Sequence, residues 1–139
     1  GHNNLGMSAA NAVAAWENGA SILDCGLMGM ARSAGNLATE MCVALMRRRG
    51  QMEDIDFYGM LDFIDQRLQP AMEQYKYHNP VPPLDLVLGY SGCHSSFVKQ
   101  FKAAAAEKNV SLYRLISEVS EINKKNPKPE LIAEIAESL

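Results

Sequence analysis

The sequence predicts an α/β fold in which two βα units are followed by an all-helical region. In the first half, short apolar runs alternate with helix-length amphipathic stretches, and residues 84–139 have helical patterns almost throughout. A proline-rich stretch separates the two regions. We therefore expect a first domain at residues 1–75, a connector at residues 76–83 and a helical C-terminal domain at residues 84–139.

The first predicted helix spans residues 5–18, which contain few helix breakers. Gly19 suits the position just past its end. Residues 21–27 then predict a short strand whose one charged residue is Asp24. A charged side chain inside an apolar strand either forms hydrogen bonds in the interior or belongs to a catalytic site, and we favour the structural role for Asp24.

A glycine-punctuated loop at residues 26–35 leads into a predicted helix at residues 37–49. Asn36 precedes this helix, and its side-chain oxygen can accept a backbone N–H of the first turn. The run of three arginines at residues 47–49 suits the negative end of the helix dipole. A phosphate-binding site is the alternative for this run, and a solvated helix end is the favoured interpretation.

The remaining chain predicts four further helices. Asp56 begins the first of them, and Pro70 is expected to end or kink it near Gln69. Pro129 suits the first turn of the last helix. The other three predicted helices span residues 95–108, 111–124 and 130–138.

Composition excludes several classes of protein. The chain has 139 residues, 47% of them hydrophobic, which is enough for a packed core and excludes wholesale disorder. A net charge of −3 gives no support for binding to nucleic acid or to a membrane surface. The three cysteines form no CxxC pair, so reduced thiols are expected rather than disulfides. With no predicted signal peptide or bilayer-spanning run, we expect a cytoplasmic protein.

Three blocks of sequence resemble one enzyme superfamily. They are Gly-His-Asn-Asn-Leu-Gly at residues 1–6, Gly-Asn-Leu-Ala-Thr-Glu at residues 35–40 and Leu-Gly-Tyr-Ser-Gly-Cys-His-Ser-Ser-Phe at residues 88–97. The first two resemble the metal-dependent pyruvate aldolase and 3-hydroxy-3-methylglutaryl-coenzyme A lyase superfamily. The third is similar to the start of the C-terminal helical domain of bacterial 4-hydroxy-2-oxovalerate aldolases. The resemblance covers nearly the whole chain.

The resemblance implies the last two βα units of a (β/α)₈ TIM barrel, a fold of about 250 residues that this chain cannot close alone. It also implies a divalent cation, Mn²⁺ or Mg²⁺, held by an Asp and a His-x-His pair. His2 matches the second histidine of that pair, and the first would lie before the chain begins. Asn36 matches an asparagine that also binds the metal in the lyase branch. The chain is thus expected to be the C-terminal part of such an enzyme.

The implied reaction is cleavage of a 4-hydroxy-2-oxo acid to pyruvate and an aldehyde. A cation that chelates the 2-oxo acid stabilises the enolate, while a base takes the proton of the 4-hydroxyl. The family places that base and an assisting arginine outside this chain, and Arg32 matches a position where relatives carry a small residue. The resemblance further implies an acylating aldehyde dehydrogenase as a partner of the C-terminal helices, and we expect an oligomer.

One position departs from the family pattern. His94 stands where relatives carry a tyrosine that shapes the aldehyde pocket, so we predict it to be a pocket-lining residue of the catalytic site. A histidine can still donate a hydrogen bond, but it is shorter and titrates near neutral pH. A plain surface histidine is the alternative.

Two other functions stay open. An acyl-coenzyme A lyase of the same superfamily is disfavoured because its catalytic cysteine precedes the glycine-rich loop, and no cysteine lies at residues 26–35. A helical docking module without catalysis would instead need a protein partner for exposed apolar helix faces. Binding of a divalent metal separates the enzyme from the docking module.

Overall fold

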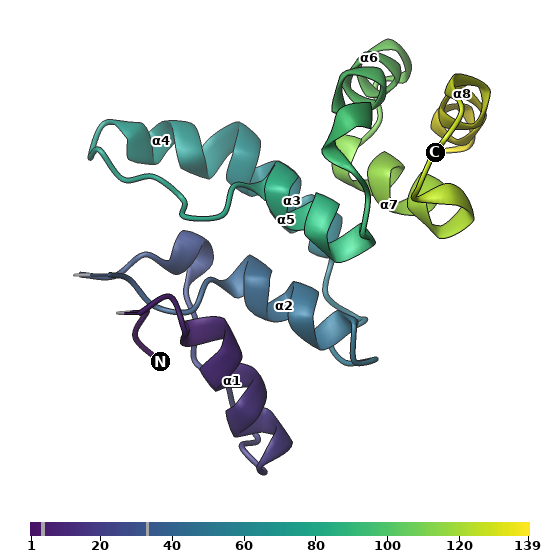
Figure 1. Ribbon diagram of the computed structural model, residues 1–139. Helices are drawn as coiled ribbons and strands as arrows, with labels where there is room; N and C mark the ends of the chain where they lie inside the picture. Colours follow the sequence, from purple (N-terminus) through teal and green to yellow (C-terminus); the bar gives the residue numbers. More distant parts are fainter. Residues whose placement is uncertain (4, 33) are drawn as a thin grey trace. The chain divides into compact units, whose positions relative to one another are not determined.

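The computed structural model describes residues 1–3, 5–32 and 34–139, and the chain forms two compact units at residues 1–81 and 82–139. Helices joined by irregular loops make up both units (Figure 1). The helical elements of the first unit are α1 (Ser8–Glu17), η1 (Leu27–Gly29), α2 (Thr39–Arg47), α3 (Phe57–Phe63), η2 (Ile64–Leu68) and α4 (Gln69–Glu73). Those of the second unit are α5 (Pro83–Ser91), η3 (Ser95–Phe97), α6 (Val98–Lys108), α7 (Leu112–Asn123) and α8 (Pro129–Ser138).

The predicted α/β fold with two βα units of a barrel is wrong for this chain. The described residues form two isolated β-bridges, His2 with Asn36 and Gly26 with Ala38, and no sheet. The predicted strand at residues 21–27 has irregular backbone up to the bridge at Gly26, and Leu27 begins η1. A strand is stable only when neighbouring strands satisfy its backbone groups, and one bridge does not supply them.

Two predictions about helix starts in the first unit also need correction. The first helix begins at Ser8 rather than at Leu5, and Asn3 Oδ1 accepts hydrogen bonds from the Ser8 hydroxyl at 2.9 Å and the Ser8 N–H at 3.3 Å. Asn36 does not cap α2, because Ala38 occupies the N-cap position and no side chain caps this helix. The side chain of Asn36 is therefore available for another role.

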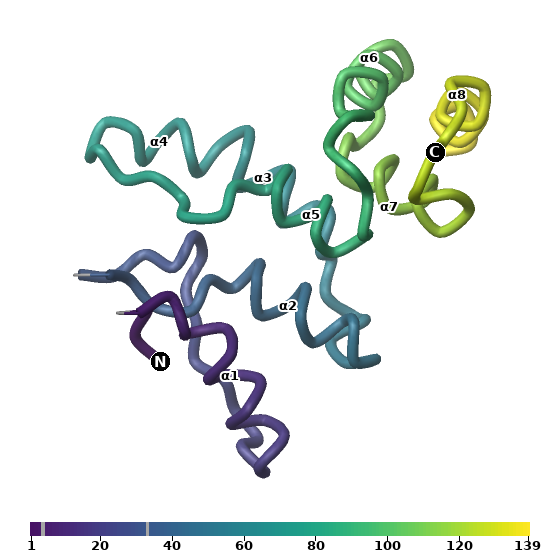
Figure 2. The backbone as a smooth tube through the Cα atoms, viewed as in Figure 1, coloured from purple at the N-terminus to yellow at the C-terminus, as the bar shows by residue number. Residues whose placement is uncertain are grey.

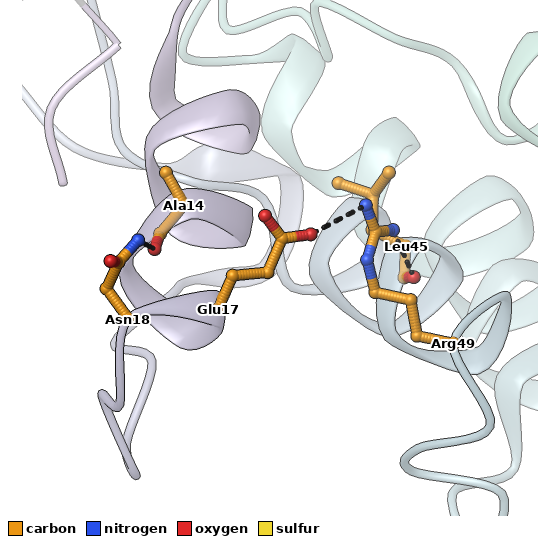
Figure 3. Close-up of polar contacts among 5 residues, drawn as sticks. All are labelled: Ala14, Glu17, Asn18, Leu45 and Arg49. Carbon is orange, nitrogen blue, oxygen red and sulfur yellow. Dashed lines mark hydrogen bonds and ion pairs between the residues drawn. The ribbon is translucent and has the colours of Figure 1, made fainter.

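Helices α1 and α2 pack against each other around Leu37, Cys42 and Met46. Residues of α1 that contact this cluster are Ala9, Ala12, Val13 and Trp16. At the ends of the two helices, Arg49 Nη2 lies 3.7 Å from Glu17 Oε1, and Arg49 Nη1 donates to the Leu45 carbonyl at 3.0 Å (Figure 3).

The contacts of two of the three consecutive arginines favour the helix-end interpretation over a phosphate site. Arg49 pairs with Glu17, as described above. Arg47 Nη1 donates to the Ile55 carbonyl at 2.8 Å, and its guanidinium lies 5.7 Å from the centre of the Phe57 ring. Both guanidinium groups are thus engaged within the first unit.

Pro70 alters the third predicted helix without ending it. The α-helical hydrogen-bond pattern of α3 gives way to a π-helical turn, η2, and α4 begins at Gln69 with Pro70 in its first turn. A proline inside a helix lacks an N–H and crowds the carbonyl four residues earlier. The wider π-helical turn just before Pro70 is a common way to accommodate such a local disruption.

The second unit is built on α7, which contacts α5, α6 and α8. Its first turn is capped by Ser111, whose hydroxyl accepts the Arg114 N–H at 3.4 Å, and Pro129 begins α8 as predicted. The buried apolar residues of this core include Val87, Phe101, Leu115, Ile116, Val119 and Ile132. No helix in the described part of the chain combines the length and apolar character needed to cross a lipid bilayer.

Candidate functional site

The structure brings the two predicted metal ligands, His2 and Asn36, onto neighbouring backbone segments. They form an antiparallel β-bridge, flanked by hydrogen bonds from Asn3 N to Gly35 O at 2.9 Å and from Leu37 N to Gly1 O at 3.2 Å. Figure 2 shows the N-terminal segment running beside the loop that enters α2. Directly opposed residues of an antiparallel pair project their side chains to the same face. The imidazole and the amide therefore share one side of this pairing.

The side-chain oxygen of Asn36 is buried and has no hydrogen-bond partner among the described residues. A buried amide oxygen left in this way costs about 1–3 kcal/mol, so its retention points to a functional role. Amide oxygens and imidazoles are both donors that divalent cations accept. Across the described residues, however, no three His, Cys, Asp or Glu side chains gather at one place. His2 and Asn36 thus fit part of a metal donor set.

A pocket of about 250 Å³ lies beside Asn36. The residues that line it include Asn3, Asn36 and Asn79, with Met28 and Gly29 of the loop and Met41 of α2. Asn36 and Asn79 are separated by more than forty positions in the sequence, and the connector at residues 76–81 returns the chain to the loop. The lining is mostly apolar, with a few polar groups among which Asn36 Oδ1 has no partner in the described residues.

The loop before Asn36 is held in a tight conformation by its glycines. Gly29 has φ +64° and Gly35 has φ +80°, and the Asn36 N–H donates to the Gly29 carbonyl at 3.0 Å. A Cβ atom at Gly35 would lie 2.7 Å from the Gly29 carbonyl oxygen. The two glycines permit this close approach, which fixes the position of Asn36 relative to η1.

Glu40 fixes the same loop from the other side. Its side chain is buried in α2, where Oε2 accepts the Met28 N–H at 3.0 Å and Oε1 accepts the Asn79 amide at 3.0 Å. The Tyr77 hydroxyl donates to the Met28 carbonyl at 2.8 Å. Met28 has φ +56°, an uncommon conformation for a side chain with a Cβ atom, and both of its backbone polar groups are held by this network.

Burial and the nearby negative charge of Glu40 raise the pKa of the Tyr77 phenol above its ordinary value. Tyr77 therefore remains a neutral hydrogen-bond donor across the physiological pH range. Its donation to the carbonyl of Met28 therefore stays intact near neutral pH.

Comparison with known proteins shows what the chain is similar to. Residues 1–66 match the family model described as HMGL-like. Over 99% of this chain the sequence is 34% identical to 4-hydroxy-2-oxovalerate aldolase 2 of Nocardia farcinica and 33% identical to 4-hydroxy-2-oxovalerate aldolase of Moorella thermoacetica. Over 86% of the chain it is 39% identical to 4-hydroxy-2-oxovalerate aldolase of Desulfitobacterium hafniense. The chain is thus similar to the 4-hydroxy-2-oxovalerate aldolases over nearly its whole length.

The chain spans about two-fifths of the length of the curated relatives it matches, 39% for the Nocardia protein and 40% for the Moorella protein. The HMGL-like region contains His2, Asn36 and Glu40, whereas Tyr77 and Asn79 lie beyond it. The match to the aldolases continues through both units of the structure.

The remaining predicted site residues lie elsewhere. His94 belongs to the second unit, where its exposed side chain forms the N-cap of η3 and its Nδ1 accepts the Ser96 N–H at 3.2 Å. Asp24 is exposed on irregular backbone and lines a second pocket of about 290 Å³, so its predicted interior position in a strand is wrong. Arg32 is exposed on the loop.

Sequence reasoning missed the polar network around Met28. Glu40 stands in one of the recognised blocks, but no role was predicted for it, and residues 76–83 were interpreted only as a connector. One signal was present in the sequence, because Glu40 is an acidic residue followed by the apolar run of α2. Tyr77 and Asn79 carry no comparable local signal.

Proposed function

We propose that the chain is part of a divalent-metal-dependent aldolase that cleaves a 4-hydroxy-2-oxo acid to pyruvate and an aldehyde. The observation that carries the proposal is the pairing of His2 with Asn36, whose buried Oδ1 has no partner among the described residues. The names of the homologues support the substrate class. The chain covers two-fifths of those relatives, so we assign the remaining metal donors and the catalytic base to residues outside these 139.

His2 and Asn36 would hold the cation through an imidazole nitrogen and an amide oxygen. When bound, Mn²⁺ or Mg²⁺ supplies Lewis-acid stabilisation of the enolate formed from the 2-oxo acid. The chain's own contribution is to position the amide oxygen: the Gly29–Gly35 contact sets the loop, and the Glu40 and Tyr77 hydrogen bonds fix Met28. Preorganised donors of this kind lower the reorganisation needed during catalysis.

The helices of residues 84–139 are proposed to bind an acylating aldehyde dehydrogenase that consumes the aldehyde product. The aldolase match over 99% of the chain includes this region and supports the proposal. His94 stays a candidate for lining the aldehyde pocket. Its contacts with Ser96 are made through Nδ1, so it would bind an aldehyde through Nε2.

The test is pyruvate release from 4-hydroxy-2-oxovalerate by the complete gene product, measured over a range of Mn²⁺ concentrations. Asn36→Ala and His2→Ala are each expected to lower kcat/KM by at least about 10–100-fold and to raise the Mn²⁺ concentration required, since metal-site substitutions have effects of that size or larger. Asn11→Ala, at an exposed position of α1, is the matched control. An Asn36→Ala enzyme with unchanged Mn²⁺ dependence would contradict the proposal.

A further inference from the structure

Two cysteines lie in the core of the first unit, one before and one after the loop that carries Asn36. Cys42 in α2 is 2% exposed, and the partly buried Cys25 packs against the cluster that Cys42 forms with Leu37 and Met46. Both cysteines are free thiols.

Backbone pairing holds the two thiols in this arrangement. Gly26, next to Cys25, forms a parallel bridge with Ala38, with hydrogen bonds from Gly26 N to Leu37 O at 3.0 Å and from Thr39 N to Gly26 O at 2.9 Å. One helical turn later, the Cys42 N–H donates to the Ala38 carbonyl at 2.9 Å. Cys25 therefore adjoins one residue of the bridge, and Cys42 follows the other residue by one helical turn. The bridge holds the two segments together.

The environments of the two thiols give them different reactivities. Burial, together with the charge of the Cys25 thiolate and a hydrogen bond between the two side chains, raises the pKa of Cys42 to about 11. Cys42 is then protonated near neutral pH and is a poor first nucleophile. Cys25 is partly exposed, so a soluble oxidant reaches it first.

We propose that Cys25 and Cys42 form a reversible disulfide site whose oxidant is a low-molecular-weight disulfide such as oxidised glutathione. The Cys25 thiolate attacks the glutathione disulfide and releases one reduced glutathione. The Cys42 thiol, losing its proton, then attacks the sulfur of Cys25 and releases the second. Two protein thiols are oxidised and one glutathione disulfide is reduced to two thiols, so electrons and protons balance.

The new bond would enclose residues 26–41, a segment that contains Met28, Asn36 and Glu40. Oxidation would thus tie the start of α2 to the segment before η1 and restrict the loop that positions Asn36. The chemistry of the thiol pair does not rest on the aldolase proposal, because it needs only the packing of Cys25 against the cluster that contains Cys42.

Peptide mapping tests the proposal directly. The protein is incubated with oxidised glutathione, the remaining thiols are alkylated in denaturant, and the chain is digested with trypsin without reduction. Cleavage after Arg32 and Arg47 places Cys25 in the peptide that ends at Arg32 and Cys42 in residues 33–47. We expect two of the three thiols to be lost and these two peptides to be joined by a bond that dithiothreitol breaks.

Two variants provide matched controls. Cys93 is buried in the second unit, where its Sγ contacts the His94 carbonyl at 3.7 Å, so Cys93→Ser should give the same linked peptides as the natural protein. Cys25→Ser should give none and should retain both remaining thiols. Three thiols still free after incubation, a stable adduct of glutathione on Cys25, or a linkage that includes Cys93 would each overturn the proposal. The mapping of the natural protein decides the matter even where a variant fails to fold.

Discussion

Glu40 joins two segments that are distant in sequence. One carboxylate oxygen binds the backbone of η1, twelve positions earlier, and the other binds the Asn79 amide, thirty-nine positions later. Glu40 is 1% exposed, so bulk water cannot take the place of its carboxylate as the hydrogen-bond acceptor for either donor. A single acidic residue therefore connects α2, the loop that carries Asn36 and the connector.

Replacing Glu40 with glutamine tests this arrangement. The glutamine keeps the shape of the side chain, but its NH₂ group replaces one carboxylate oxygen. That group then faces either the Met28 N–H or the Asn79 NH₂, so one hydrogen bond is lost and two donors face each other. We expect Glu40→Gln to lower the free energy of unfolding by about 1–3 kcal/mol, measured by urea denaturation. The same change at the exposed Glu53 should stay within about 0.5 kcal/mol. Equal effects at the two positions would rule out the proposed role of Glu40.

At the level of single residues, the sequence predicted roles for some residues of the resembling blocks and missed the hydrogen bonds that act across the fold, those of Glu40 included. His2 and Asn36 were named as candidate ligands, and the structure pairs their backbones. Tyr77 acts on Met28 across forty-nine positions, and nothing in the local sequence around Tyr77 reports such a contact. Periodicity describes which face of a helix is buried and carries no information about long-range hydrogen bonds.

Among the elements, the segment at residues 21–29 departs most from what its sequence predicts. Residues 21–27 favour a strand, yet their backbone is irregular up to the bridge at Gly26, and Met28 adopts φ +56° within η1. Short apolar runs do not distinguish strands from other buried backbone. The helices that begin near Ser111 and Pro129 were predicted correctly, because their caps are local signals.

Gly35 provides a test of the loop itself. An alanine there must adopt φ +80° and also place its Cβ 2.7 Å from the Gly29 carbonyl oxygen. Gly19 has φ +97°, and a Cβ atom added there would have no other atom near it. Gly19→Ala therefore measures the conformational strain without any overlap of atoms, and we expect it to cost about 1–2 kcal/mol. We expect Gly35→Ala to cost roughly 1–3 kcal/mol more, from the overlap of atoms, in matched urea titrations. Indistinguishable losses in the two variants would mean that the close approach is not a real constraint.

For the whole molecule, the main feature is that each unit has a core of its own. In the first unit, α1 and α2 enclose Leu37, Cys42 and Met46, and in the second unit α7 is surrounded by α5, α6 and α8. The predicted boundary residues 76–83 include the position where the units divide, after Val81. Units with separate cores are expected to open separately in the native state.

Ile116 in α7 allows this separation to be measured. Its side chain is fully buried, so Ile116→Ala should remove about 2–5 kcal/mol from the stability of the second unit. Hydrogen exchange followed by mass spectrometry should show faster exchange in α6, α7 and α8 and unchanged exchange in α2. Ile122 lies on the same helix and is 63% exposed, so Ile122→Ala should change neither unit. Faster exchange in α2 of the Ile116→Ala protein would show that the two cores unfold as one, and the site loop would then depend on the helices of the second unit for its stability.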